Sequence, residues 1–387
     1  MNKKIRNLLI LLMIAISLVF SSCATSTHMN VEEEAPAVAA EETTAMMPME
    51  EEKKENSVDG VFVEADKYGN MLTSLTKDDL DAAGLSFGDM VNVTVEGVDY
   101  VCPIVSTYSD VDVGDFLLRA KDDGSIYFAI NYGNCAKKTG AVADMPLTIS
   151  MNNKGAYLLE YQTRHLEKSE ERSDYASDAI FANFREVTTS NIAPGVLYRS
   201  ASPVLGDARA PYADKLAMAA GIKTIVNLAD SEESMMATID PNSWYKTMYD
   251  AGHVILLDMD VDYSGEEFGK LLGQGFKYMA ANEPPYLVHC NEGKDRAGFA
   301  SVILEALMGA DLNEITYDYM MSYSNYYGVQ KGTAKYNYIA DTPYNMLMTI
   351  SNGMEVTDKN LSAIAYDYMI RNGLTTDEIV ELMGNLM

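Results

Sequence analysis

The sequence predicts a small all-β, barrel-like domain over residues 58–147, followed by an α/β domain over residues 178–387 in which helices flank a parallel-rich sheet. Short strand-like runs separated by Gly and Asp turns fill the first region, whereas strands alternate with helix-length segments in the second. The length of 387 residues exceeds that of one ordinary domain, and a hydrophobic content of 48% can fill a core in each. Residues 148–177, with their charged stretch from Arg164 to Asp174, are expected to form a connector.

The overall charge limits the classes of partner. A formal net charge of −28 argues against nucleic acid and against a polybasic membrane surface. An anionic substrate would therefore need local positive charge, for which the candidates are Lys294, Arg296, Arg185 and Arg199. Because the chain has only four histidines, no histidine-rich metal site is expected. We also expect no cofactor.

The first 23 residues have the pattern of an export signal. Three basic residues precede an apolar run, Leu8–Phe20, that is shorter than the roughly 20 residues of a membrane-spanning helix. The segment from Val19 to Cys23 resembles the bacterial lipobox, in which the cysteine is lipidated and becomes the mature N-terminus. We therefore expect an exported bacterial lipoprotein, anchored through Cys23 on the extracytoplasmic side of a membrane, in the periplasm or at the cell surface. The alternative is an ordinary secretory signal that contains a cysteine.

Residues 24–57 are expected to form a disordered acidic tether. They carry nine glutamates against two lysines, with many Ala, Thr and Pro. Such a segment cannot bury enough apolar surface to offset the entropy lost on ordering.

The predicted β domain is built from alternating runs, which include Val61–Val63, Met90–Val95, Tyr100–Val105 and Ser125–Ile130. Three further segments resemble, in order and spacing, the C-terminal β-domain of the S-adenosylmethionine hydroxide adenosyltransferase and halogenase family: Asp66–Thr73, Thr107–Gly114 and Ile130–Ala136. In that family the domain closes an adenosine site made mainly by a larger N-terminal domain. No segment of this sequence resembles that larger domain, so adenosyl transfer is not expected.

Two features of the β domain are open. Tyr68, Asn70 and Asn134 either help to hold a nucleoside-like ligand or belong to turns that need positive φ. Cys102 and Cys135 either pair in an oxidising compartment or stay free.

The α/β domain reads in order as follows. A strand ends at Tyr198-Arg-Ser200, a helix covers about residues 211–220, and strands follow at Ile222–Leu228 and Val254–Leu257. Ser264 then begins a helix with one apolar face. In such a sheet the functional site lies at the carboxyl ends of the strands.

The stretch from Tyr286 to Gly298 organises this domain. It predicts a strand, a short loop and a buried helix, and Gly293 lets the loop fold back on itself. The loop N–H groups, the positive end of the helix and the Arg296 guanidinium then form a pocket for a tetrahedral dianion. The same positive field favours the thiolate form of Cys290, the nucleophilic form.

The pattern His289-Cys290-x5-Arg296 resembles the signature loop of cysteine-dependent protein tyrosine phosphatases. Its Gly-Lys-Asp-Arg ending is similar to that of bacterial tyrosine and dual-specificity phosphatases that also accept phosphoinositides, and less closely to that of myotubularins. The resemblance implies that Cys290 forms a cysteinyl-phosphate, that Arg296 clamps the phosphate and that His289 orients the loop. It places the remaining loop positions around the phosphate: Asn291, Glu292, Gly293, Lys294 and Ala297.

The resemblance leaves the role of Arg199 open, and the loop differs from the family's usual pattern at Ala297 and Glu292. Arg199, in the Tyr-Arg-Ser strand end, is either a second phosphate contact or half of a structural ion pair. Ala297 stands where the family usually has Ser or Thr, whose hydroxyl helps the thiolate to leave, so turnover of the intermediate is expected to be slow. Glu292 stands where relatives with this ending often have a small residue.

Several aspartates compete for the role of general acid, which protonates the leaving oxygen. Asp260 and Asp262 follow a predicted strand about thirty residues before Cys290, as does Asp258. Asp295, inside the loop, is the competing candidate by resemblance to myotubularins.

The sequence thus predicts an exported phosphatase that acts on a phosphotyrosine protein, an inositol phosphate or a phosphoinositide. The alternative is a surface protein with a weak or inactive phosphatase site that captures phosphorylated or nucleoside-like ligands.

Overall fold

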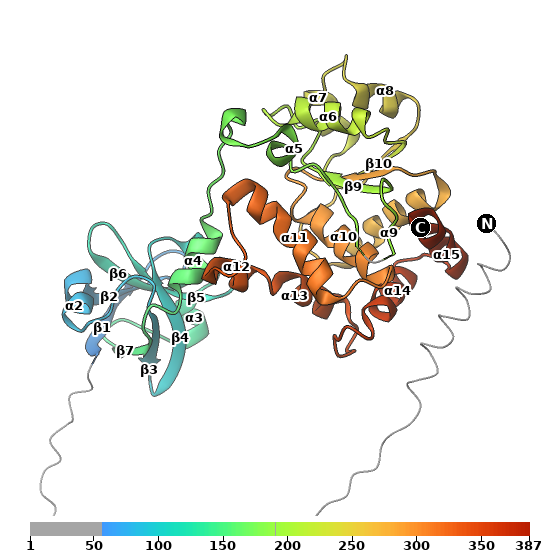
Figure 1. Ribbon diagram of the computed structural model, residues 1–387. Helices are drawn as coiled ribbons and strands as arrows, with labels where there is room; N and C mark the ends of the chain where they lie inside the picture. Colours follow the sequence, from blue (N-terminus) through green and yellow to red (C-terminus); the bar gives the residue numbers. More distant parts are fainter. Residues whose placement is uncertain (1–55, 190) are drawn as a thin grey trace, which may run out of the picture. The chain divides into compact units, whose positions relative to one another are not determined.

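The structure is a computed structural model that describes residues 56–189 and 191–387 (Figure 1). Within these residues the chain divides into two compact units, one that ends at His165 and one that begins at Leu166. The predictions of a signal peptide at 1–23, of lipidation at Cys23 and of most of the tether at 24–57 lie outside the described residues. Among the described residues, none of the helices combines the length and apolar character needed to cross a membrane.

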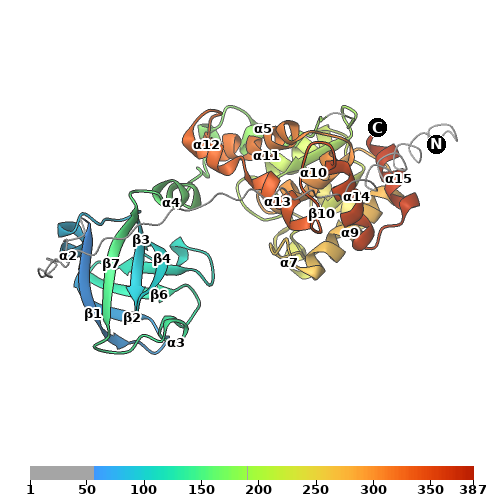
Figure 2. The same cartoon turned by 90° about the horizontal axis from the view of Figure 1, so that it is seen from below.

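The first unit is a closed seven-stranded barrel, which confirms the predicted barrel-like domain. The strands follow the order β1-β2-β6-β5-β4-β3-β7 around the barrel, and Figure 2 shows β1, β7 and β3 side by side. Their bounds are β1 (Ser57–Ala65), β2 (Met71–Thr76), β3 (Met90–Val95), β4 (Val98–Val105), β5 (Phe116–Ala120), β6 (Ser125–Ile130) and β7 (Pro146–Asn153). Alternation fills the interior: Val91, Val93 and Val95 of β3 are buried, while the residues between them are partly exposed.

Short helices complete the barrel. Helix α2 (Lys77–Ala82) begins at a capping box between Thr76 and Asp79, and α3 (Cys135–Thr139) begins at Asn134, whose side chain accepts the Lys137 N–H. Helix α4 (Leu158–Arg164) follows β7, and the hydroxyl of Tyr157 at its start donates to the Asp110 carbonyl.

The barrel unit extends beyond residue 147, where the sequence placed the end of the β domain. Strand β7 continues to Asn153 and pairs with both β1 and β3, so its whole length is needed to close the barrel. Tyr157 is buried in the same core as Val105 and Leu117. The first half of the expected connector, 148–177, therefore belongs to the barrel unit. The alternating pattern of β7 was obscured because it ends in the polar residues Asn152 and Asn153.

The cysteines of the barrel are free thiols. Cys102 and Cys135 are both buried in its core, and no disulfide joins them in the described part of the chain. Burial raises the pKa of Cys135 to about 12 and that of Cys102 further, so both remain protonated.

The second unit contains a five-stranded sheet of order β11-β10-β12-β9-β8, which confirms the predicted parallel-rich sheet. Strands β9 to β12 run parallel, and β8 is antiparallel at one edge. Their bounds are β8 (Arg185–Glu186), β9 (Leu197–Ser200), β10 (Thr224–Asn227), β11 (Val254–Leu256) and β12 (Tyr286–His289).

Helices cover both faces of this sheet. Ile225 and Leu287 pack into one apolar cluster with Tyr245, while their neighbours Val226 and Val288 pack into a second, larger cluster. The helices are α5 (Asp178–Phe181), α6 (Ala210–Ala219), α7 (Glu232–Thr238), α8 (Trp244–Asp250), α9 (Glu266–Ala281), α10 (Arg296–Leu307), α11 (Leu312–Tyr327), α12 (Ala334–Ile339), α13 (Thr342–Ile350), α14 (Leu361–Arg371) and α15 (Thr376–Leu386).

Helix α10 is the centre of the larger cluster. From Ala297 to Leu307 every residue of this helix is buried, and it packs on α11, α13 and α14 (Figure 1). The almost wholly apolar sequence after Arg296 accounts for this position, because a helix that is apolar on all sides has to be enclosed. Its first turn is thereby fixed at the carboxyl edge of the sheet.

Candidate active site

The loop between β12 and α10 lies at the carboxyl edge of the central strand. Strand β12 is flanked by β10 and β9, and the carbonyl of His289 accepts the Leu228 N–H as the strand ends. Cys290 is 2% exposed at the base of the loop, and Arg296 is the first residue of α10. The structure thus brings together the strand, loop and helix that the sequence predicted here.

The loop carbonyls are turned toward the body of the domain. The four carbonyl groups of residues 291 to 294 all accept hydrogen bonds from outside the loop. The donors are the Ser202 N–H for residue 291, the Asn183 amide and Tyr326 hydroxyl for residue 292, and the Arg199 guanidinium for residues 293 and 294. Because N–H and C=O point in opposite directions in a peptide, the N–H groups are left for the concave side, which suits an anion.

Gly293 is the position where only glycine fits. Its φ is +65°, and a Cβ atom there would lie 2.2 Å from the backbone carbonyl oxygen of Ser200. The loop is therefore in close contact with the end of β9, as its curvature requires.

Arg199 lies behind the loop, which corrects its assignment as a phosphate contact. The side chain is fully buried, and Nη1 donates to Asp318 at 2.6 Å. Nη2 donates to the carbonyls of Gly293 and Lys294 at 2.8 and 3.0 Å. Of the two alternatives left by the sequence, the structure contains the ion pair. The Nε, Nη1 and Nη2 atoms of Arg199 all donate to protein groups.

Asp318 is a site residue that sequence reasoning missed. It also accepts from Arg185 at 2.9 Å, so one carboxylate on α11 joins two arginines. Although burial opposes ionisation, the two guanidinium groups hold the pKa of Asp318 below its ordinary value. Nearby, burial raises the pKa of Glu305 well above its ordinary range, so this carboxyl is neutral. The cluster therefore keeps a net positive charge beneath the loop.

His289 is a buried, neutral imidazole directly before the loop, and its ring contacts Tyr245 of α8. Tyr245 lies 2.9 Å from its Nε2 and accepts from the Asn227 amide at 3.2 Å, which leaves the tyrosine hydrogen for the imidazole. Burial lowers the pKa of His289 to about 3. Its predicted role in orienting the loop is consistent with this buried position.

Arg296 keeps a buried donor for a ligand. Its Nη1 donates to the Met259 carbonyl at 2.6 Å, which fixes the side chain against the loop after β11. Within the described ranges, the buried Nε finds no acceptor. A buried N–H without a partner is unfavourable unless something binds it, so the Nε atom is available for an oxygen of a bound anion.

The acid candidates of the 258–262 loop are exposed. Asp260 accepts from the N–H of Asp262, which in turn accepts from Ser264, so both carboxylates serve the local turn. Asp258 is also exposed. The loop nevertheless lies beside the site, because Arg296 bonds to Met259 within it.

Asp295 lies on the loop between β12 and α10, directly before Arg296. Its side chain is half-buried and 3.8 Å from Lys294, and this partial desolvation raises its pKa above the ordinary value despite the neighbouring cations.

Lys294 and Glu292 form the mouth of the site. Lys294 donates to the Tyr327 hydroxyl at 3.1 Å, lies over the rings of Tyr323 and Tyr327, and is 3.2 Å from a Glu292 oxygen. The tyrosines of α11 thus form one wall beside Lys294. Asn291 is exposed and Ala297 is fully buried.

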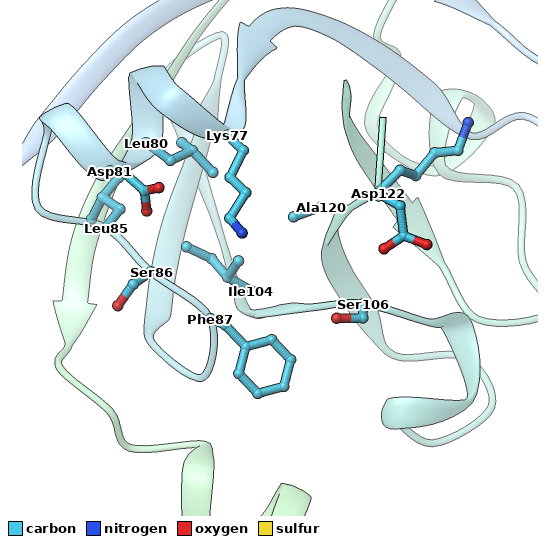
Figure 3. A pocket seen from close by; sticks show the side chains of 11 residues that line it. Lys77, Leu80, Asp81, Leu85, Ser86, Phe87, Ile104, Ser106, Ala120 and Asp122 are labelled. Carbon is cyan, nitrogen blue, oxygen red and sulfur yellow. The ribbon is translucent and has the colours of Figure 1, made fainter. Parts of the chain in front are cut away.

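The barrel has a hollow of its own, with a volume of about 220 Å³ (Figure 3). It lies beside α2 and is lined by residues such as Lys77, Asp81, Phe87 and Asp122. The proposed nucleoside residues do not line it.

Tyr68, Asn70 and Asn134 belong to turns in the structure. The Asn70 amide bonds to Asp66 and the Asn134 side chain caps α3, while Tyr68 is largely exposed. These contacts favour the turn alternative over the ligand alternative.

Comparisons with known proteins agree with these two units. Residues 180–386, more than half of the chain, match the model of the tyrosine phosphatase family. Residues 60–148 match the C-terminal domain of S-adenosylmethionine hydroxide adenosyltransferases. No curated protein sequence gives a significant match.

Similar solved structures include three of low likeness. An uncharacterised conserved protein from Thermotoga maritima is 19% identical over 33% of this chain and 42% of its own, with a TM-score of 0.24. A conserved hypothetical protein from Thermus thermophilus is 22% identical over 24% and 34%, with a TM-score of 0.19. The matched region thus spans less than half the length of both. The core catalytic domain of the PP-IP phosphatase SIW14 from S. cerevisiae is 19% identical over 43% and 94%, with a TM-score of 0.27.

Proposed function

The chain belongs to the tyrosine phosphatase family, and from this premise we propose that it hydrolyses phosphate monoesters through a cysteinyl-phosphate on Cys290. One observation carries the proposal most directly. The carbonyls of residues 291 to 294 are all bonded away from the loop, and the buried Nε of Arg296 is left without an acceptor among the described residues. Donors without acceptors around a buried cysteine suit a bound phosphoryl group.

In the proposed first step, the Cys290 thiolate attacks phosphorus while the bond to the leaving oxygen breaks. The loop N–H groups and Arg296 hold the equatorial oxygens, whose charge they stabilise in the transition state. Asp295 gives its proton to the leaving oxygen. In the second step water attacks the phosphorus, Asp295 takes a proton from it, and Cys290 leaves as thiolate.

We assign the acid role to Asp295 because its pKa is raised, which keeps it protonated to higher pH. Asp260 and Asp262 are the competing candidates, since their loop lies against Arg296. Their carboxylates serve local turns, and either would have to move to reach a substrate.

The test is hydrolysis of 4-nitrophenyl phosphate by the wild type and by Cys290→Ser. We expect turnover in the wild type, none in Cys290→Ser, and retained binding of inorganic phosphate by that variant. Equal turnover in both would exclude Cys290 as the nucleophile. Arg296→Lys keeps the charge but loses the planar guanidinium, and we expect about a 10²- to 10³-fold loss in kcat, as for other oxyanion donors.

The substrate class remains part of the proposal. We propose a phosphotyrosine protein, an inositol phosphate or a phosphoinositide, because the mouth joins a tyrosine wall to Lys294. Phosphate release from a panel of phosphotyrosyl peptides, inositol phosphates and phosphoinositide vesicles, with phosphoseryl peptides for comparison, separates the three. A preference for phosphoseryl peptides would contradict the choice.

A second candidate function is supported by Ala297, whose methyl side chain is fully buried at the start of α10. Without a hydroxyl there, the site would bind phosphorylated ligands and release them slowly. Rapid-quench kinetics distinguish the two: a burst of product equal to the enzyme, followed by almost no turnover, indicates a binding protein. Ala297→Ser should then raise the steady-state rate about tenfold if loss of the thiolate limits turnover.

We also propose export and anchoring through Cys23, supported by the basic residues, the apolar run and the lipobox-like segment of the sequence. Cell fractionation tests it. Cys23→Ser should move the protein from the membrane fraction to the soluble extracytoplasmic fraction, whereas an unchanged distribution would exclude this anchor.

A further inference from the structure

We propose that Lys168, in the linker before α5, positions the Glu292 carboxylate and thereby sets the affinity of the catalytic loop for anions. The inference rests on the proposed function, because it concerns the phosphate pocket of the same site. It assigns a positioning role to a residue outside the region 180–386 that matches the tyrosine phosphatase family.

The starting point is an electrostatic problem. Glu292 lies two residues after Cys290, in the loop that has to accept a phosphate dianion. An ionised carboxylate free to turn toward that dianion would repel it, and the repulsion is strong where the surroundings are partly desolvated. A glutamate at this position is compatible with phosphate binding only if its charge is held and compensated.

The structure contains that compensation. Lys168 forms an ion pair with Oε1 of Glu292, and Lys294 lies 3.2 Å from Oε2, so each oxygen has its own cation. Lys168 is only 21% exposed, and its ammonium lies 5.2 Å from the centroid of the Tyr326 ring. Burial opposes ionisation of Glu292, but the hydrogen bond from Lys168 and the charge of Lys294 lower its pKa. The carboxylate is therefore charged and clamped between two cations.

The linker that carries Lys168 is anchored to the domain. Arg209 is 1% exposed, donates to the carbonyl of Ser169 at 2.5 Å, and forms an ion pair with Glu170. Tyr175 donates to the same Ser169 carbonyl at 2.7 Å. The backbone beside Lys168 is thus fixed by a buried arginine, which distinguishes this pair from ordinary surface ion pairs between flexible side chains.

Lys168 and Glu292 therefore act as a unit. Without Lys168, the Glu292 carboxylate keeps only Lys294 and turns toward the remaining positive charge of the loop, where it competes with phosphate. Without Glu292, there is no carboxylate to hold, and Lys168 supplies only the distant attraction of one charge. The effect of removing Lys168 should depend on which residue occupies position 292.

The experiment measures binding of inorganic tungstate, a tetrahedral dianion, by calorimetry on the full chain in a Cys290→Ser background. We expect Lys168→Met to weaken binding about tenfold, Lys168→Arg to restore it, and Glu292→Gln to tighten binding severalfold. In the Glu292→Gln background, Lys168→Met should change the dissociation constant by only about twofold. Because the two single variants move in opposite directions, a general loss of folding cannot account for both.

Kinetics with intact Cys290 provide a second readout. Lys168→Met should raise KM for 4-nitrophenyl phosphate and leave kcat nearly unchanged, because the clamp acts on bound substrate and transition state alike. The matched control is Lys223→Met. The Lys223 ammonium is exposed and lies 3.0 Å from the Glu283 carboxylate, at the amino-terminal ends of the strands and away from the loop. This variant should change neither parameter.

Equal effects of Lys168→Met with Glu292 intact and in the Glu292→Gln background would overturn the inference and indicate that Lys168 contacts the ligand directly. Unchanged tungstate binding in Lys168→Met would also overturn it, as would failure of the chain to bind tungstate. If Cys290→Ser retains turnover, the proposed nucleophile is wrong, yet the tungstate data still decide whether the clamp exists.

Discussion

At the scale of single residues, the environment of each ionisable group determines its protonation state at the site. His289 and Glu305 are neutral because they are buried, whereas Asp318 and Glu292 stay charged because cations surround them. Asp295 lies between these cases, on the loop and with a raised pKa. These differences separate the structural carboxyl groups from the one suited to proton transfer.

Replacement of Asp295 tests its role as the acid. Because the protonated form acts in the first step, which kcat/KM reports, kcat/KM should fall as pH rises through the raised pKa of Asp295. Asp295→Asn should lower kcat by about 10²- to 10⁴-fold and remove that limb of the pH profile. Asp262→Asn, at an exposed turn residue, is the control. If its profile loses the limb instead, the acid lies in the loop after β11.

His289 should make stability depend on pH. Its pKa is about 3 in the folded state, against about 6.5 in an unfolded chain, so the unfolded state binds the extra proton between these values. The free energy of unfolding should therefore decrease as pH falls below about 6.5, by up to about 1.4 kcal/mol per pH unit. Urea unfolding of His289→Gln at several pH values should show a shallower decrease than the wild type. His253→Gln, at an exposed histidine, is the control for the substitution itself.

At the scale of elements, the loop between β12 and α10 is held from behind by groups that are distant in the sequence. Strand β9 supplies Arg199 and a close backbone contact, and α11 supplies Asp318 and the tyrosine wall. The helix α10 that follows is enclosed by apolar side chains, so the loop has little freedom at either end. Such support from rigid neighbours is what keeps a binding loop in its productive shape.

A substitution at Gly293 tests this support. Gly293→Ala places a Cβ atom against the Ser200 carbonyl at positive φ, and we expect a loss of about 3 kcal/mol in unfolding free energy together with loss of turnover. Gly221→Ala is the matched control, because its φ is +66° and nothing lies within 4 Å of its Cβ. It should cost about 1 kcal/mol and leave kcat/KM unchanged. Similar effects of both variants would show that backbone strain alone, and not the contact with β9, matters.

At the scale of the whole molecule, the described residues form two units with separate cores. The barrel closes only when β7 pairs with β1 and β3, and the second unit already begins at Leu166. The residues between 147 and 178 are therefore divided between the two units and are not a free connector.

Fragments test this division. A fragment of residues 56–165 should unfold in one cooperative transition, whereas 56–147 lacks most of β7 and should be unfolded, because an open barrel exposes its core and strand edges. Circular dichroism during heating distinguishes them. Cooperative unfolding of the shorter fragment would show that Ile149 and Tyr157 are not needed for the core.

The sequence by itself determined the two fold classes and the order of strand, loop and helix around His289 and Arg296, and it predicted that Cys290 and Arg296 share one pocket. This was possible because strand alternation, the apolar helix and the spacing of the loop residues are local properties of the chain. The tertiary structure alone decided that Arg199 lies behind the loop, that Asp318 joins it to Arg185, and that Lys168 contacts Glu292. These pairs join residues more than a hundred positions apart, and no local pattern specifies which charged side chains burial will bring together.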